Sequence, residues 1–256
     1  MTKLNLAINI SRKVGYYLMQ YWGDAGKVEQ KSSFSDLVTQ YDKNAQKIII
    51  DEIKQNFPDD GILAEEGVDE KANNLWVIDP IDGTINYIHG LPSYSISIAY
   101  LENEKPIFGV VYSPVNNETF VGIKNQGAYL NGVKLKIINK SNLNETVGSI
   151  GFFPNFTGLF ISKIESKVRR IRILGSAAIS ASYVAAKKFD FFIAKKANPW
   201  DIAAAYLIVE ESGGKIVDFQ GKKPNLLKKG SFIFANPGIL NKILTIVNEL
   251  GGIKWN

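Results

Sequence analysis

The stretch "WVIDPIDGTINYIHG", Trp76 to Gly90, places two aspartates three residues apart around a proline and follows them at once with Gly-Thr. The apolar run that ends before Asp79 is typical of a buried strand, so both acids are expected where this strand reaches the edge of its sheet. Pro80 fixes its own φ and disfavours helix at Asp79, while Gly83 lets the backbone approach a ligand closely. The stretch therefore predicts that Asp79 and Asp82 are held on one rigid turn.

The residues after this turn favour binding of an anion. A short helix is expected to begin at Thr84, and the free N–H groups of Gly83 and Thr84 would point outward at its start. Two acids beside such a site repel a bare phosphate, and a divalent cation between them removes the conflict. The structural alternative is that Asp79-Pro80 starts a turn and Asp82 caps the short helix. The turn alone leaves both interpretations open.

The amino-acid composition limits the classes to which this protein can belong. With 256 residues, 45% hydrophobic and 21% charged, the chain can bury a large core as one domain or as two packed halves with a cleft. It has no cysteine, which rules out a disulfide framework and a thiolate metal site, and a cytoplasmic location is expected. The first 22 residues predict an amphipathic helix with polar interruptions, not a signal peptide or a membrane span. The net charge of +5 fits an anionic partner, but the lysine pairs are scattered, so nucleic-acid binding is not predicted.

The pattern of apolar residues changes along the chain. Two helices are expected before Pro58, and short strands from Ile62 to Lys136 predict a mostly antiparallel sheet with a type I′ turn at Asn131-Gly132. Strands then alternate with helices, which predicts a layered α/β arrangement. These helices are expected around residues 157–168, 176–188, 200–212 and 237–249. The polar segment after Ile138 suggests an N-terminal α+β half, 1–138, and a C-terminal α/β half, 139–256, with the site in a cleft between them.

Several motifs together resemble one family. The segment "WVIDPIDGTINYIHGLPSYSISIAY" is similar to the signature of the inositol monophosphatase family, which belongs with fructose-1,6-bisphosphatases and 3′(2′),5′-bisphosphate nucleotidases to a superfamily of lithium-sensitive phosphatases. Further similar motifs follow the family's order over nearly the whole chain: "KSSFSDLVTQYD", "ILAEEG", "GAYLNG", "LGSAAISASYVAA" and "PWDIAAAYLIVEESGG". The resemblance implies an α+β fold, a layered α/β/α/β/α sandwich of the inositol monophosphatase/fructose-1,6-bisphosphatase type.

The resemblance also implies a metal site. Its ligands would be Glu65, Asp79, the carbonyl of Ile81, Asp82 and Asp201. Oxygen ligands suit two or three Mg²⁺ ions, for which Mn²⁺ may substitute. The single histidine, His89, is interpreted as structural.

The implied reaction is hydrolysis of a phosphate monoester by metal-activated water, without a covalent phosphoenzyme. Glu65 would orient the water, and Thr84, hydrogen-bonded to Asp42, would make the other contact. Lys31, Asp36 and Asp42 belong to a segment that resembles the family's mobile loop. The predicted phosphate and substrate contacts are Gly83, Thr84, Gly175, Ser176, Ala177, Lys195 and Arg172.

The sequence departs from the family pattern at Ala194. Inositol-preferring members are expected to carry a glutamate there that accepts hydrogen bonds from substrate hydroxyls. Here Lys195 and Lys196 follow an alanine, and Arg172 lies upstream of the "LGSAA" turn. Losing an acid and gaining cations favours a substrate with a second anionic group, so fructose-1,6-bisphosphate joins inositol-1-phosphate as a candidate. The alternative is that these are surface lysines after an edge strand.

Two rival functions remain. A nucleotidase acting on 3′-phosphoadenosine 5′-phosphate is disfavoured because "DGTINYIHG" is closer to the inositol and fructose branches. A non-catalytic RNA-associated or regulatory protein on the same fold is permitted by the basic charge. The resemblance further implies a homodimer, and the apolar run "AAISASYVAA" could pack within or between subunits.

Overall fold

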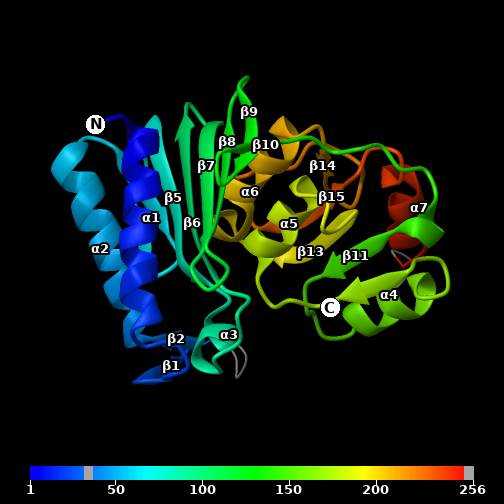
Figure 1. Cartoon of the computed structure of the whole chain (residues 1–256), viewed down its shortest axis with the longest axis horizontal. Helices are drawn as coiled ribbons and strands as arrows, with labels where there is room; N and C mark the ends of the chain where they lie inside the picture. Colours follow the sequence, from blue (N-terminus) through cyan, green and yellow to red (C-terminus); the bar gives the residue numbers. More distant parts are fainter. Residues whose placement is uncertain (32–36, 251–256) are drawn as a thin grey trace.

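The computed structural model describes residues 1–31 and 37–250, so the predicted site residue Asp36 lies outside the described part. Five layers follow one another across the molecule (Figure 1). Helices α1 (Lys3–Met19) and α2 (Gln40–Asn56) cover the outer face of a large sheet, and α5 (Ala177–Ala185) and α6 (Pro199–Glu211) lie between it and a second sheet. Helices α4 (Thr157–Ile164) and α7 (Leu240–Leu250) cover the far face of the second sheet. The predicted layered sandwich is confirmed.

The large sheet has eight strands in the order β10-β9-β8-β7-β6-β5-β3-β4. Every neighbouring pair is antiparallel except β3 and β5. Both residues of the Asn131-Gly132 turn have positive φ, 49° and 81°, as a type I′ turn requires. The strands are β3 (Gly61–Ala64), β4 (Val68–Asp69), β5 (Asn74–Asp82), β6 (Ser95–Glu102), β7 (Lys105–Ser113), β8 (Glu118–Ile123), β9 (Gly127–Leu130) and β10 (Val133–Leu135).

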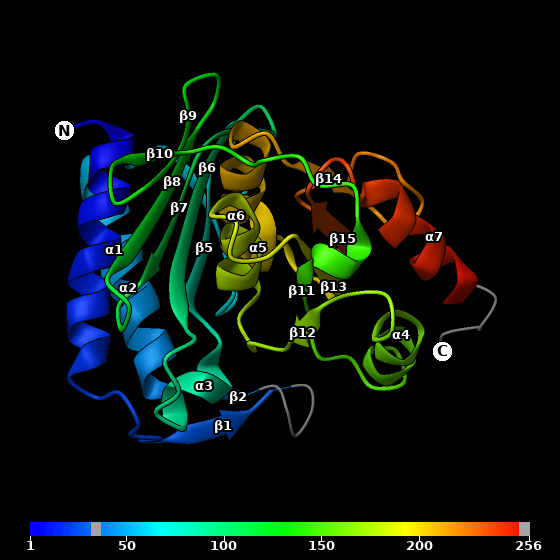
Figure 2. The ribbon, with the colours of Figure 1, turned by 45° about the vertical axis from the view of Figure 1, so that its right-hand side comes forward.

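The second sheet has five strands in the order β12-β11-β13-β15-β14, with β13 parallel to β11 and antiparallel to β15. Its strands are β11 (Val147–Ile150), β12 (Arg170–Arg172), β13 (Phe191–Ala197), β14 (Lys215–Val217) and β15 (Gly230–Ala235). A small pair, β1 (Val28–Gln30) and β2 (Leu37–Thr39), lies beside the short helix α3 (Thr84–Ile88) (Figure 2). Helix α4 ends at Ile164, earlier than the sequence predicts, because the chain then turns back and the Arg169 N–H donates to the Thr146 carbonyl.

Helix α6 is the centre of the core. It is apolar on all sides because it packs between the two sheets, and a Cβ on Gly109 would lie 2.3 Å from the Ala204 carbonyl oxygen. Glycine at this strand position therefore lets the helix approach the sheet closely. Side chains from both halves of the chain, including Phe120 and Phe192, join one buried cluster around α6. The boundary after Ile138 remains a prediction.

None of the helices in the described ranges is both long enough and apolar enough to cross a membrane.

Candidate active site

A cavity of about 510 Å³ lies between the two halves, a size typical of small-molecule sites. The "DPIDGT" turn and the start of α3 form one wall, and the Gly175–Ala177 turn, β13 and the start of α6 form the other. Four carboxyl side chains from three separate parts of the sequence line it: Glu65, Asp79, Asp82 and Asp201. Folding thus gathers the predicted metal-binding acids around one space, together with Ile81, Gly83 and Thr84.

The turn that carries Asp79 and Asp82 belongs to strand β5 itself. The strand continues to Asp82, and its pairing with β6 shifts register between the two aspartates. Such an irregularity re-aims side chains, and the Ile81 N–H donates to Asp79 Oδ1 at 3.0 Å within it. Gly83 has φ of 102°, and a Cβ there would meet the Ser93 carbonyl oxygen at 3.0 Å. Glycine is therefore required where the turn passes into α3.

Asp82 does not cap the helix that follows it, because α3 begins without a side-chain cap. Its carboxylate accepts hydrogen bonds instead from the first residues of α5, in the other half of the chain. The Ala178 N–H donates to Oδ2 at 2.8 Å, the Ala177 N–H to Oδ1 at 3.0 Å, and the Ser176 hydroxyl also donates to Oδ2. Ser95 donates to Oδ2 at 3.2 Å. Since Oδ1 receives only one of these bonds, it keeps an acceptor position for a cation.

Of the four acids, Glu65 forms an ion pair with Lys31, whereas Asp79, Asp82 and Asp201 form none with a cation of the described residues. Burial raises the pKa of Asp79 and Asp201 well above the usual range, and the neighbouring carboxylates raise it further. Burial also raises the pKa of Asp82, against the hydrogen bonds from Ser176 and α5. The pKa of Glu65 rises to about 7, chiefly through burial, although Lys31 opposes the shift. Asp79 is 2% exposed, so its ionised form needs a positive partner, which a divalent cation would supply.

The acids surround the cavity without forming a closed cage. Across residues 1–31 and 37–250, no three or more Asp, Glu, His or Cys side chains are already placed to hold one ion together. Mg²⁺ commonly takes one or two carboxylates and completes its octahedron with waters and substrate phosphate. The donor set therefore fits Mg²⁺ bound together with a phosphate ester.

Thr84 and Asp42 form the predicted pair. The Thr84 hydroxyl lies 2.9 Å from Asp42 Oδ1 and 3.1 Å from the Ile81 carbonyl oxygen. Asp42 is fully buried at the start of α2, where the N–H and hydroxyl of Thr39 donate to its Oδ2. This is a capping box, which holds Asp42 still while its other oxygen faces Thr84. Burial raises the pKa of Asp42, and the Thr39 and Thr84 hydrogen bonds oppose the shift.

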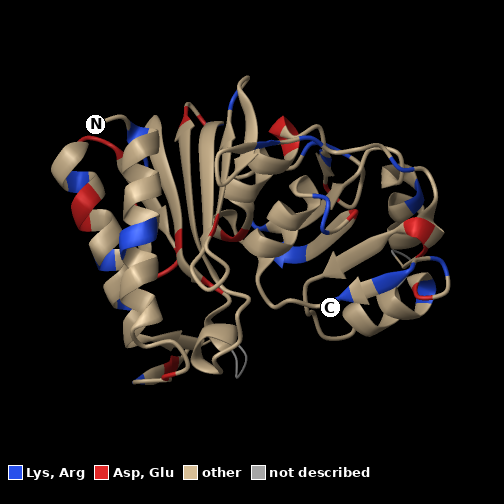
Figure 3. Ribbon diagram, in the orientation of Figure 1, with Lys and Arg blue, Asp and Glu red and all other residues tan. Residues whose placement is uncertain are grey.

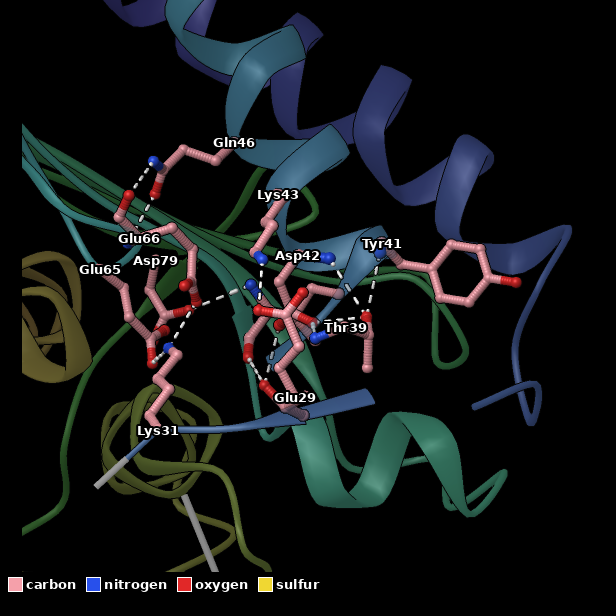
Figure 4. Close-up of polar contacts among 12 residues, drawn as sticks. Glu29, Lys31, Thr39, Tyr41, Asp42, Lys43, Gln46, Glu65, Glu66 and Asp79 are labelled. Atoms are coloured by element: carbon pink, nitrogen blue, oxygen red, sulfur yellow. Dashed lines mark hydrogen bonds and ion pairs between the residues drawn. The ribbon is translucent and has the colours of Figure 1, made fainter. Parts of the chain in front are cut away.

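Lys31 reaches the acids from the end of β1 (Figure 4). Its Nζ lies 3.0 Å from Glu65 Oε1 and 2.6 Å from Glu66 Oε1. Glu66 is in turn fixed to α2, because its N–H and carbonyl both bond the Gln46 side-chain amide. The loop acid Glu65 is thus positioned through Glu66 and Lys31, two contacts that depend on the tertiary fold.

The substrate side of the cavity differs in detail from the expectation. Gly175, Ser176 and Ala177 line it as predicted. Lys196 also lines it, whereas Lys195 is placed with its Nζ 5.1 Å from the centre of the Phe156 ring. Arg172 is exposed and donates to the Ile171 carbonyl, and it is not among the residues that line the cavity in the described part. Figure 3 shows the other lysines and arginines scattered over both halves rather than gathered along one stripe.

Two positioning residues were missed from the sequence. Asn86 Nδ2 donates to the Ser93 carbonyl at 2.6 Å and to the Leu174 carbonyl at 2.7 Å, which ties α3 to the turn before α5. Ser95 donates to Asp82 from the next strand. Both residues lie within the signature segment, residues 76–100, yet their partners are set by strand pairing and by the packing of the two halves against each other.

Comparisons with known proteins find relatives that match nearly the whole chain. The fructose-1,6-bisphosphatase/inositol-1-monophosphatase of Thermotoga maritima is 49% identical over 250 residues, covering 98% of this chain and 97% of that protein. The solved Thermotoga maritima IMPase superposes with a TM-score of 0.95 at 48% identity, covering 98% of this chain and 99% of that one. The Nus factor SuhB of Escherichia coli (strain K12) is 36% identical over 259 residues, covering 96% of each chain.

A fourth relative links the fold to a metal. The structure of an IMPase/NADP phosphatase complexed with Mg²⁺ and phosphate has a TM-score of 0.87 at 27% identity, covering 95% of this chain and 94% of that one. The family model described as "Inositol monophosphatase family" matches residues 2–251. The chain therefore belongs to the inositol monophosphatase family, whose members are phosphatases of small phosphorylated substrates.

Proposed function

We propose that this protein is a Mg²⁺-dependent phosphomonoesterase that hydrolyses inositol-1-phosphate, fructose-1,6-bisphosphate or both. The observation that carries the proposal is the meeting of four buried or half-buried acids around one cavity, beside the Thr84–Asp42 pair. No histidine or cysteine lines that cavity in the described part of the chain, so oxygen ligands dominate the site.

Glu65, Asp79, the Ile81 carbonyl, Asp82 and Asp201 would hold the metal. When bound, Mg²⁺ would polarise the phosphate oxygens and make a coordinated water more acidic. Asp82 would contribute Oδ1, since its other oxygen is occupied by Ser95, Ser176 and the Ala178 N–H. Asp201 accepts the Asn198 N–H at 2.7 Å through Oδ2, which fixes the first turn of α6 against the site.

The remaining steps belong to the chain's own residues. Glu65 lines the cavity together with Asp79 and Asp82, where its carboxylate would orient the attacking water and accept a proton from it. Thr84 holds the same water from the other side, and Asp42 keeps the Thr84 hydroxyl aimed. The backbone of Gly83 and Thr84 is proposed to meet the phosphate, and that of Gly175 to Ala177 the substrate hydroxyls, because all these residues line the cavity.

The test is phosphate release by the purified protein, with and without Mg²⁺, on inositol-1-phosphate, fructose-1,6-bisphosphate and 3′-phosphoadenosine 5′-phosphate. Asp201→Asn should lose activity by about a thousandfold, because it removes a ligand charge from the site. Asp69→Asn is the matched control, since Asp69 is an exposed acid on β4. Turnover of the nucleotide alone would replace the proposed substrates, and absence of any Mg²⁺-dependent turnover would reject the proposal.

The similarity to the Nus factor SuhB supports a second candidate, a regulatory role in an RNA-associated complex. All four acids remain in the cavity here, which favours catalysis over a purely binding function. A salt-sensitive complex with RNA, formed without phosphate release from any of the three esters, would favour the regulatory role.

The predicted homodimer and the predicted boundary after Ile138 are part of the same proposal. Both follow from the resemblance and the sequence pattern, and sedimentation of the purified protein measures the oligomeric state directly.

A further inference from the structure

Strand β13 carries an irregularity beside the cavity. Ala194 pairs with Phe232 and Ala197 pairs with Gly230, so three steps along β13 match two along β15. The extra residue produces a β-bulge, and within it Lys196 has φ of 58°, in the left-handed region that a lysine rarely adopts. Bulges next to active sites re-aim side chains. Here the result is that two consecutive lysines have different surroundings.

The two lysines differ in what they face. Lys195 Nζ lies over the Phe156 ring. Lys196 lines the cavity, and it is the single cation among the described residues that do so. Lys196 forms no ion pair with an acid of residues 1–31 or 37–250. The cavity therefore presents one exposed lysine that has no counter-ion among residues 1–31 and 37–250.

The cavity-lining residues nearest to Lys196 along β13, Ala194 and Ala197, are apolar, and Asp201 at the start of α6 is the acid on the same wall. Ala194 is buried and lines the cavity, so no acid competes for the ammonium group from that position. The described neighbours of this wall are Gly151, whose N–H bonds the Ile193 carbonyl at 2.9 Å, and the cavity-lining Phe152 and Phe153. Because the four acids of the cavity would be neutralised by bound metal, Lys196 remains as the cation available to a second charged group of the ligand.

We propose that Lys196 determines substrate preference by binding a second anionic group, so that a sugar bisphosphate is preferred to a polyol monophosphate. The inference rests on the proposed phosphatase function and assigns its substrate class. The phosphate to be cleaved lies among the acids and their metal, and the second phosphate lies against the ammonium group of Lys196.

The test compares fructose-1,6-bisphosphate with inositol-1-phosphate in steady-state kinetics with Mg²⁺. Lys196→Gly removes the charge at a residue whose positive φ suits glycine, so the bulge is kept. We expect this variant to lower the ratio of kcat/KM for the bisphosphate over that for the monophosphate by about tenfold, chiefly through KM. Lys196→Arg keeps a cation and should retain most of the ratio.

Lys195→Ala is the matched control because it removes the same charge one residue away. We expect it to leave the substrate ratio within about twofold of wild type. Thermal unfolding of each variant checks that the fold is intact.

The outcomes separate the inference from the function on which it rests. If wild type hydrolyses both esters and Lys196→Gly leaves their ratio unchanged, the inference is overturned while the phosphatase function stands. An equal shift of the ratio in Lys195→Ala also overturns it, because the effect would then be one of general surface charge. If wild type hydrolyses neither ester, the proposed function fails and the inference fails with it.

Discussion

Asp82 Oδ2 accepts the N–H of Ala178 at 2.8 Å although 96 residues separate them in the chain. The bond joins the "DPIDGT" turn of one half to the first turn of α5 in the other. A carboxylate at a helix start satisfies free N–H groups and is stabilised by the helix dipole. Asp82 therefore stabilises the contact between the two halves by capping α5, in addition to its proposed role as a metal ligand.

Asp82→Asn should lower both stability and activity. An asparagine can place an NH₂ group against the N–H donors of α5, which leaves donors unpaired and costs about 1–3 kcal/mol in the free energy of unfolding. Activity should fall by about a thousandfold because a ligand charge is lost. Urea unfolding and phosphate release measure the two effects.

Asp69→Asn serves again as the control for Asp82→Asn, and it should change neither quantity measurably, since Asp69 is exposed. An Asp82→Asn protein as stable as wild type would contradict the capping role.

The metal-free protein should become less stable as pH rises. The pKa of Glu65, Asp79, Asp82 and Asp201 is raised in the folded state, so their contribution is present below the unfolded pKa near 4 and is lost as pH rises through the folded pKa. For Glu65 that folded pKa is about 7. We expect the metal-free Tm to fall between about pH 5 and about pH 8, and Mg²⁺ to raise it more at the higher pH.

Glu65→Gln checks the source of this pH dependence, because it removes one titrating group and should flatten the curve. A metal-free Tm that rises over this pH range would show that the buried acids do not govern it.

Lys31→Ala should tighten Mg²⁺ binding by a few-fold when measured by calorimetry at about pH 8. The ammonium group of Lys31 is paired with Glu65 and Glu66 and must give up part of this pairing when a metal binds. A partly exposed ion pair contributes about 0.2–1 kcal/mol, which sets the size of the effect.

The control for Lys31→Ala is Lys43→Ala, which removes an exposed ion pair with Glu29 on the neighbouring surface. Weaker Mg²⁺ binding by Lys31→Ala than by wild type would contradict the competition between lysine and metal.

Thr84→Val should reduce kcat by about a hundredfold or more, because it removes the hydroxyl that Asp42 aims at the proposed water. Asp42 Oδ1 would also lose a hydrogen bond, at a cost of about 1 kcal/mol in stability. Thr84→Ser keeps the hydroxyl and should stay within about tenfold of wild type in kcat. Equal activity of the valine and serine variants would exclude Thr84 from the reaction.

Local sequence patterns predicted those turns and strands whose conformation depends mainly on neighbouring residues. The type I′ turn at Asn131-Gly132 follows from residues that tolerate positive φ, and the buried strand before Asp79 follows from an unbroken apolar run. The strand's continuation to Asp82 was not predicted, because the register shift depends on pairing with β6. The early end of α4 was not predicted either, because it depends on the chain turning back so that the Arg169 N–H donates to the Thr146 carbonyl.

The sequence by itself determined which residues bear chemistry: a rigid turn with two aspartates, further acids in matching motifs, and no thiol. Only the tertiary structure decided how they act together. It placed the acids around one cavity. It directed the Asp82 carboxylate to the backbone N–H groups of α5 and not to the helix that follows Asp82 in the sequence. A β-bulge gave Lys195 and Lys196 different surroundings. The physical reason is that a residue's type and backbone preference are local, whereas burial, hydrogen-bond partners and charge neighbours depend on which distant segments pack together.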